Sequence, residues 1–253
     1  MLSLVKVATP MHLHVWLTQS MIFHDWYANT RYKFICKMWK QAVDAWRRQL
    51  KQLDRLNCFI VNDAVLNVVA KSCPGLHTLD IGILPRVYKG DSIMFRSVKA
   101  TAAALQAVAT GCPRLRRVNL STRFQILTDP IMDDKVLPFA NCCHHLSYLD
   151  VRECRIGINV LRRLAEKCPG LQHLDLNGCG EGITDDGILM IAKSCLQLRF
   201  LDISSCKCST GALQIPFPEL RQLNVCNCGM SRNDVWTAVL RNCPQIDRVQ
   251  CRN

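Results

Sequence analysis

The sequence predicts an α/β solenoid, in which short parallel strands form a curved inner sheet and helices cover the outside. Three observations predict this fold. A pattern with three aliphatic residues recurs along residues 73–251, most copies open with a cysteine, and apolar residues at helical spacing follow each copy. Because one strand-and-helix unit cannot bury its apolar side alone, the units must stack into an array.

The repeat is clearest from Cys168 to Cys179, which reads Cys-Pro-Gly-Leu-Gln-His-Leu-Asp-Leu-Asn-Gly-Cys. Alternating apolar and polar residues predict a strand in this stretch, and residues 188–192 then predict a helix. We expect six such units and a terminal half unit. They begin at Cys73, Cys112, Cys143, Cys168, Cys195, Phe217 and Cys243, at intervals of 39, 31, 25, 27, 22 and 26 residues.

Local signals predict where the helices start and where the array is irregular. Thr184 precedes two aspartates, so its side chain can cap a helix while the carboxylates favour the positive end of the helix dipole. Asp133 and Asp63 occupy the same slot in other units. Pro138 falls inside one predicted helix and should shorten or kink it. The stretches 82–99 and 121–130 exceed what a unit needs, so we expect them to form loops.

Most of the sixteen cysteines occupy two repeat positions, which predicts two ladders of stacked thiols. A buried thiol in such a ladder can bond a turn carbonyl, so neither a metal nor a cofactor is required. The alternative is a zinc site at Cys206-Lys-Cys208 with Cys226-Asn-Cys228, or at residues 142–145. The ten ladder cysteines are Cys73, Cys112, Cys143, Cys168, Cys195 and Cys243 before the strands, and Cys154, Cys179, Cys206 and Cys228 after them.

Charge and hydropathy bear on the compartment and on the class of partner. The chain carries a net charge of +12, and residues 31–55 hold eight basic against two acidic side chains. This positive field favours acidic partners and leaves nucleic-acid binding as an alternative function. No apolar run reaches the roughly 18 residues of a membrane span, and no signal-peptide pattern is present. We expect a soluble protein of the cytoplasm or nucleus.

The unit C-P-x-L-x-x-L-x-L-x-x-C followed by I-T-D resembles the cysteine-containing leucine-rich repeats of F-box/leucine-rich-repeat proteins. The resemblance covers about residues 50–253 and implies a leucine-rich-repeat solenoid. Residues 1–49 would form a separate helical segment. In that segment Phe34-Ile-Cys-Lys-Met-Trp-Lys resembles the closing helix of an F-box, and Met21-Ile-Phe resembles the preceding helix. The L-P-x-E opening of an F-box is absent, so the F-box is degenerate or truncated.

The resemblance implies a substrate-recognition subunit of a Skp–cullin–F-box ubiquitin ligase. In that family the F-box docks on the Skp adaptor. The alternative is a helical cap that shields the first repeat, in a repeat protein that binds partners without a ligase. The matching adaptor-binding residues are Ile22, Phe23, Ile35, Cys36 and Trp39.

Alternation along the strands predicts which side chains line the concave face, where a protein substrate would bind. A central column of Asp, Asn and Gln side chains lies on this face, and part of it is expected to be structural, with hydrogen bonds between strands. Arginine and aromatic side chains beside it are the expected substrate contacts. No catalytic motif is present, so we do not expect an enzyme. The contact residues are Arg117, Tyr148, Arg152, His173, Phe200 and Arg248.

Overall fold

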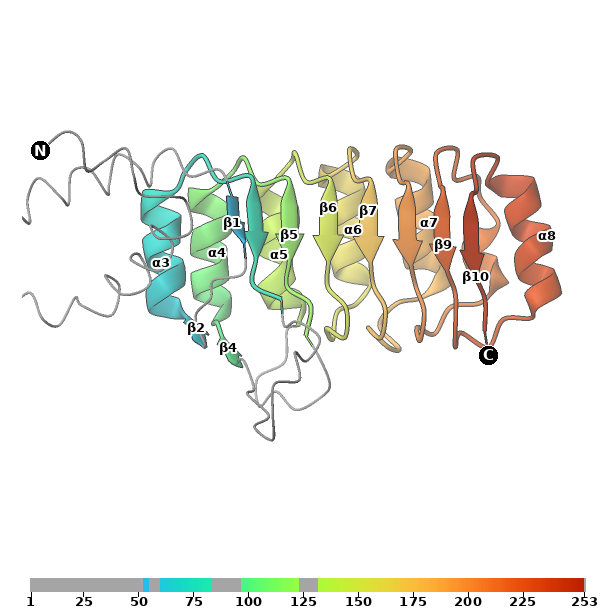
Figure 1. The fold of residues 1–253 in the computed structure, drawn as a ribbon, viewed down its shortest axis with the longest axis horizontal. Helices are drawn as coiled ribbons and strands as arrows, with labels where there is room; N and C mark the ends of the chain where they lie inside the picture. Colours follow the sequence, from blue (N-terminus) through green and yellow to red (C-terminus); the bar gives the residue numbers. More distant parts are fainter. Residues whose placement is uncertain (1–51, 55–59, 83–96, 123–131, 253) are drawn as a thin grey trace, which may run out of the picture.

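The computed structural model describes residues 52–54, 60–82, 97–122 and 132–252. In this part of the chain, strands and helices alternate and stack side by side into an elongated array (Figure 1). The predictions for residues 1–49, and for most of the two expected loops, lie outside the described residues.

The described strands form one eight-stranded parallel sheet and one small two-stranded sheet. Each strand is three residues long, and neighbours pair at the same repeat slot, as Leu149 does with Val118 and Leu174. The predicted α/β solenoid is therefore confirmed. The large sheet runs β1 (Gln52–Asp54), β3 (Thr78–Asp80), β5 (Arg117–Asn119), β6 (Tyr148–Asp150), β7 (His173–Asp175), β8 (Phe200–Asp202), β9 (Gln222–Asn224) and β10 (Arg248–Gln250), while β2 (Ile60–Asn62) pairs with β4 (Ser97–Lys99).

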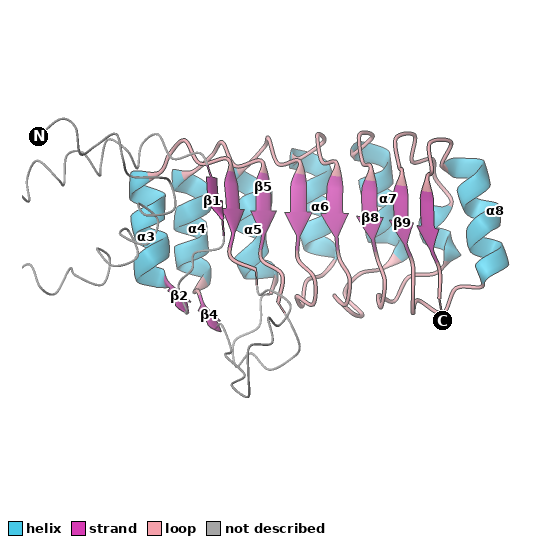
Figure 2. Ribbon diagram, viewed as in Figure 1, coloured by secondary structure: helices cyan, strands magenta, loops and turns pink. Residues whose placement is uncertain are grey.

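The described helices all lie on the same side of the large sheet (Figure 2). Consecutive helices pack against each other, so each unit contacts mainly its two neighbours. No described helix combines the length and the apolar character that crossing a membrane requires. The helices are α3 (Asp63–Ser72), α4 (Ala102–Gly111), α5 (Asp133–Cys142), α6 (Ile158–Lys167), α7 (Asp185–Ser194) and α8 (Arg232–Asn242), with a 3-10 helix, η2 (Thr210–Leu213), between α7 and α8.

The core lies between the sheet and the helices and is filled by the repeat's aliphatic residues. Leu149, Leu174 and Leu201, from three neighbouring strands, are completely buried. The largest fully buried side chains are Phe139 and Phe217. Each strand thus turns its middle residue to the core and its first residue to the opposite face, as the period of two predicts.

The two predicted thiol ladders are present. Within the first, the thiol of Cys112 donates to the carbonyl of Cys73 at 3.1 Å, and that of Cys195 donates to the carbonyl of Cys168 at 3.6 Å. In the second, Cys179 donates to Val151 at 3.1 Å and Cys206 to Leu176 at 3.1 Å. The thiols therefore bond carbonyls of the preceding repeat, and no disulfide joins the described cysteines.

Aspartates at the helix starts tie neighbouring repeats together. Asp133 accepts a hydrogen bond from the Gly157 N–H at 2.7 Å, and Asp185 accepts one from the Ser209 N–H at 2.7 Å. Thr184 makes no side-chain capping bond, so the predicted cap is wrong at this residue. The carboxylate beside it bonds the next repeat instead, because stacking brings the following turn over the start of the helix.

Several elements differ from the prediction. Pro138 does not shorten α5, which has 10 residues like α4 and α6, because packing between two neighbouring helices outweighs the lost N–H donor. The repeat that begins at Cys195 carries the four-residue η2 in place of an α-helix, since its 22-residue interval and Pro216 leave little room. Ser97–Lys99 is a strand and not part of a loop. The strand β1 was not predicted.

Candidate protein-binding face

Four of the predicted contact residues form a continuous stack on the sheet face opposite the helices, which we call the open face. Arg117 places its guanidinium carbon 4.0 Å from the centre of the Tyr148 ring. The rings of Tyr148 and His173 are 4.1 Å apart, those of His173 and Phe200 are 4.0 Å apart, and both pairs are nearly parallel. We call these four residues the stacked row.

The strand register explains the stacked row. Each member is the first residue of its strand, β5 to β8, and the strands pair without any shift. Neighbouring strands in a sheet lie about 4.8 Å apart, so flat side chains at the same slot come into stacking contact. Arg117 then covers the end of the row through a cation–π contact.

A second row, of aspartate and asparagine, runs beside the stacked row. In each of six repeats the side-chain oxygen accepts the main-chain N–H two residues further on, at 2.9–3.2 Å. Bonding between strands, which was expected for part of this row, is seen where the Asn224 amide donates to Asp202 at 2.8 Å. These residues are Asp80, Asn119, Asp150, Asp175, Asp202 and Asn224.

Arg152 is held by this acidic row. Its guanidinium lies 2.8 Å from Asp150 and 3.4 Å from Asp175. The side-chain hydrogen bond to Asp150 raises the pKa of Arg152 further, so the group stays charged. About half of its side chain remains exposed. Arg152 therefore presents a fixed positive charge next to Tyr148 and His173.

Burial sets the protonation state of this face. It lowers the pKa of His173 to about 4, and the charges of Arg117 and Arg152 act in the same direction while Asp150 opposes them. Burial likewise raises the pKa of Tyr148. Both rings are consequently neutral at physiological pH. Burial also raises the pKa of Asp175 to about 7, with the carboxylates of Asp150 and Asp202 adding to the effect.

The sixth predicted contact residue, Arg248, is separate from the stacked row. It starts β10, and Gln222 of β9 lies between it and Phe200. The sequence prediction missed a set of exposed arginines that immediately precede the strands. Their shared slot, one residue before each strand, is the signal that could have identified them. They are Arg116, Arg199 and Arg221. The predicted adaptor-binding residues lie outside the described part of the chain.

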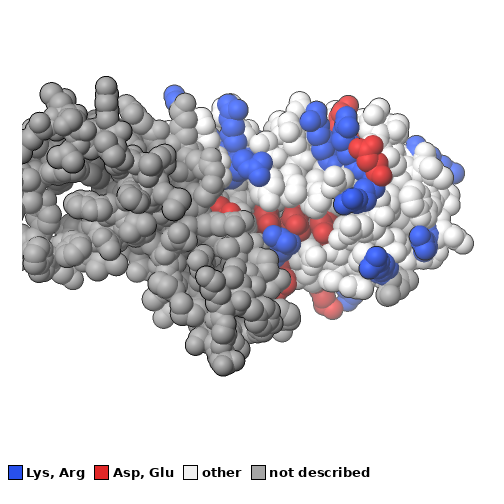
Figure 3. Space-filling model, viewed as in Figure 1, with Lys and Arg blue, Asp and Glu red and all other residues white. Residues whose placement is uncertain are grey.

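The space-filling view shows the charges of the open face together. Acidic side chains form a line across its middle, and basic side chains flank that line (Figure 3). In the described ranges, no three His, Cys, Asp or Glu side chains come together as metal ligands would. The thiols suggested as zinc ligands have other partners, as Cys208 donates to Ile183 and Cys228 to Ile203.

Comparison with known families identifies the repeats. The family model for the leucine-rich repeat matches residues 142–157 and 167–192. The first stretch contains β6 and the turn after it, and the second contains β7 and most of α7. This match gives no support to an F-box in residues 1–49. It confirms that the stacked units are leucine-rich repeats, a class of solenoid that presents an extended surface to protein partners.

Proposed function

We propose that the protein binds a protein substrate on its open face through the stacked row. The observation that carries the proposal is the contact of Arg117, Tyr148, His173 and Phe200 in one continuous stack. Arginine and aromatic residues contribute most per residue to binding energy at protein interfaces. Stacking also fixes their rotamers, so a partner that packs on them loses little side-chain entropy.

The chemistry of the face indicates what the substrate offers. The stacked row accepts apolar or aromatic side chains, and the half-exposed guanidinium of Arg152 beside it favours a segment with hydrogen-bond acceptors. Asp150 and Asp175 are buried and accept main-chain N–H groups, so they hold Arg152 and the strand ends in place. The proposal is therefore one of binding without catalysis.

The finer proposal is that the protein is the substrate-recognition subunit of a Skp–cullin–F-box ubiquitin ligase. It rests on the F-box-like residues 21–23 and 34–40 and on the repeats that follow them. The open face would hold the substrate, and the ligase would act on it by proximity. The unlinked thiols of the described repeats fit a reducing compartment, the cytoplasm or the nucleus.

Capture from cell extract tests the open face. Phe200→Ala removes one end of the stacked row, and Arg162→Ala, on the exposed surface of α6, is the matched control. Quantitative mass spectrometry should show proteins that the wild type and the control retain equally and that Phe200→Ala loses at least about tenfold. Equal capture by all three chains would overturn the proposal.

Binding of the purified Skp adaptor tests the finer proposal separately. Calorimetry with the full chain should show a complex, and Trp39→Ala should weaken it. An intact chain that does not bind the adaptor would overturn the ligase assignment. The open-face proposal would survive that result, because it rests on residues 117–200 alone.

A further inference from the structure

The last repeat leaves its apolar side uncovered among the described residues. In the preceding repeat, Leu220, Leu223 and Val225 are at most 1% exposed. The residues at the same slots of the last repeat, Ile246, Val249 and Cys251, are only partly buried. The cause is positional, because β10 is the terminal strand of the described sheet and nothing described stacks beyond it.

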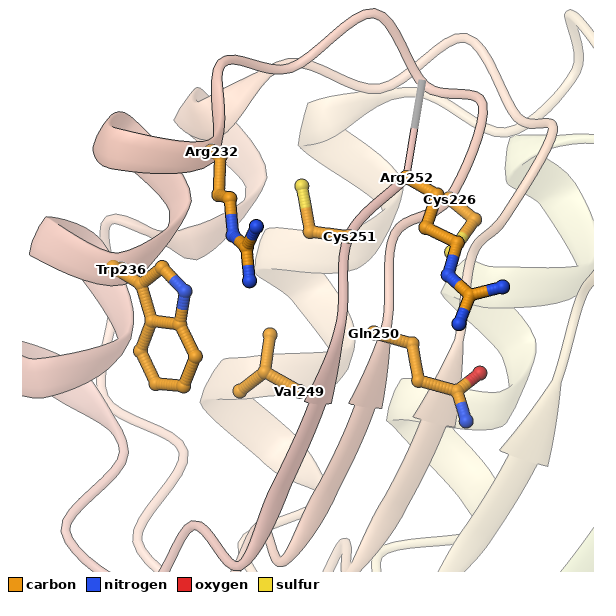
Figure 4. A pocket seen from close by; sticks show the side chains of 7 residues that line it. All are labelled: Cys226, Arg232, Trp236, Val249, Gln250, Cys251 and Arg252. Carbon is orange, nitrogen blue, oxygen red and sulfur yellow. The ribbon is translucent and has the colours of Figure 1, made fainter.

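A pocket of about 520 Å³ lies at this end, between α8 and β10. Figure 4 shows Arg232 reaching from the start of α8 into the space beside Trp236, Val249 and Cys251. Trp236 is 38% exposed, and Leu240, one turn further along α8, is 74% exposed. The pocket therefore has an apolar floor that is accessible from outside.

The charge of the pocket is positive. Arg232 reaches in on the helix side of β10, and Arg252 lies on the other side of the strand (Figure 4). Neither makes an ion pair with any described residue, and none of the seven lining residues is acidic. Guanidinium groups bind carboxylates in pairs of parallel hydrogen bonds, so an acidic ligand fits this rim.

The edge of β10 offers main-chain hydrogen bonds as well. Within the sheet, the N–H of Leu176 donates to Asp202 of the next strand at 2.8 Å, and that of Val225 donates to Gln250 at 2.9 Å. Cys251 occupies the same repeat slot, and no described strand supplies an acceptor for its N–H. An exposed strand edge of this kind can pair with an extended segment of another protein.

We propose that this end of the solenoid binds a short, extended, acidic segment of a protein partner as an added strand beside β10. Side chains of an extended segment alternate between its two faces. The apolar ones cover Trp236, Val249 and Cys251, the carboxylates between them face Arg252, and a carboxylate at the end of the segment binds Arg232. The site is distinct from the stacked row, because β9 separates β10 from Phe200.

A synthetic peptide tests the proposal with the full chain. The probe is acetyl-Glu-Leu-Glu-Val-Glu-Leu-Glu-amide, and the same peptide with lysine in place of glutamate is its control. Hydrogen exchange should slow at the Val249 and Cys251 amides when the acidic peptide is added. The tryptophan fluorescence should change with the same affinity, and Trp236→Phe should abolish that change.

Matched variants separate the pocket from the general positive charge. Arg232→Glu should weaken binding of the acidic peptide by at least about tenfold. Arg241→Glu makes the same charge change elsewhere on α8 and should leave the affinity within about twofold. Equal losses in the two variants, or no protection at Val249 and Cys251, would overturn the proposal. Protection that rises with protein concentration and without peptide would also overturn it, in favour of a second copy as the occupant.

This test is independent of the open-face proposal. Phe200→Ala, which disrupts the stacked row, should bind the acidic peptide as the wild type does. Loss of peptide binding in that variant would contradict two separate sites.

Discussion

His173 lies between two aromatic rings, and its position decides how the stacked row responds to pH. Burial lowers the pKa of its imidazole to about 4, so the ring stays neutral from pH 5 upward. A neutral imidazole stacks on Tyr148 and Phe200 without bringing a charge into the row. Binding through the stacked row should therefore not depend on histidine protonation between pH 6 and 8.

The pKa of Asp175, beside His173 on the open face, is shifted in the opposite direction. Its pKa is raised from 3.8 to about 7, mainly by burial and then by the neighbouring carboxylates. Between these two values the folded chain holds a proton that the unfolded chain has released. The shifted pKa of Asp175 therefore contributes to the free energy of unfolding below pH 4, and this contribution is lost as the pH rises through 7.

Asp175→Asn should therefore stabilise the protein at neutral pH. The amide keeps the acceptor for the Asn177 N–H and has no proton to lose, and asparagine already fills this slot at Asn119. The gain should grow from pH 4 to pH 7.5 to at most about 4 kcal/mol, at about 1.36 kcal/mol per pKa unit. Urea unfolding across this pH range measures it.

Comparing the variant with the wild type at each pH cancels the contribution of His173 to the free energy of unfolding. That contribution runs the other way, because its lowered pKa costs stability as the pH falls from 6.5 to 4. A difference that is flat with pH would contradict the raised pKa of Asp175.

At the scale of the elements, the sequence predicts which residues of the repeat strands face the core, because burial fixes the phase of each strand. The middle residue of each strand must face the core, so a shift of one residue would expose a leucine such as Leu149. Other features depend on contacts between distant residues. Asp133 bonds Gly157, 24 residues away, and no local pattern distinguishes this bond from a helix cap.

The two aspartates at the start of α5 allow a matched test of these ties. Asp133→Ala removes the hydrogen bond to Gly157 and should lower the free energy of unfolding by about 1.5–3 kcal/mol. Asp134→Ala removes only a carboxylate near the helix dipole and should cost below about 1 kcal/mol. Urea midpoints of both variants check this, and equal losses would show that the tie contributes nothing.

Thiol labelling tests the ladders. Burial raises the pKa of Cys112, Cys168 and Cys195 to about 12, so very little thiolate is present at pH 8. Among the described cysteines, iodoacetamide should modify the half-buried Cys142, Cys226, Cys228 and Cys251 of the native protein first. The buried Cys112, Cys168 and Cys195 should react only after unfolding, as peptide mapping would show. Fast labelling of Cys168 in the native protein would contradict the ladder.

At the scale of the whole molecule, stacking turns one repeat slot into a surface. The alternation of each strand identifies the residues of the open face, and the structure places the six predicted contact residues there. Which of these side chains touch one another depends on which residues occupy the same slot in neighbouring strands. Four stack because consecutive strands carry flat groups, whereas Gln222 separates Arg248 from the row and two carboxylates hold Arg152.

The end of the array also has a property that no single repeat shows. Internal repeats are covered on both sides, while α8 and β10 expose Trp236 and Val249 at the pocket. The sequence prediction counted the last unit as a half repeat but did not identify this site. In the sequence, these residues match an ordinary repeat. The pocket becomes apparent only because the structure places β10 at the end of the described sheet.

Site-specific photocrosslinking tests the central claim most directly, that the open face binds the partner. A photoreactive benzoylphenylalanine replaces Phe200 in one chain and Arg162, on the outer surface of α6, in another. Both chains are irradiated in cell extract under the same conditions. The structure predicts that Phe200→benzoylphenylalanine crosslinks to a protein partner and that the α6 chain does not. Crosslinks to that partner from α6 alone would contradict the account.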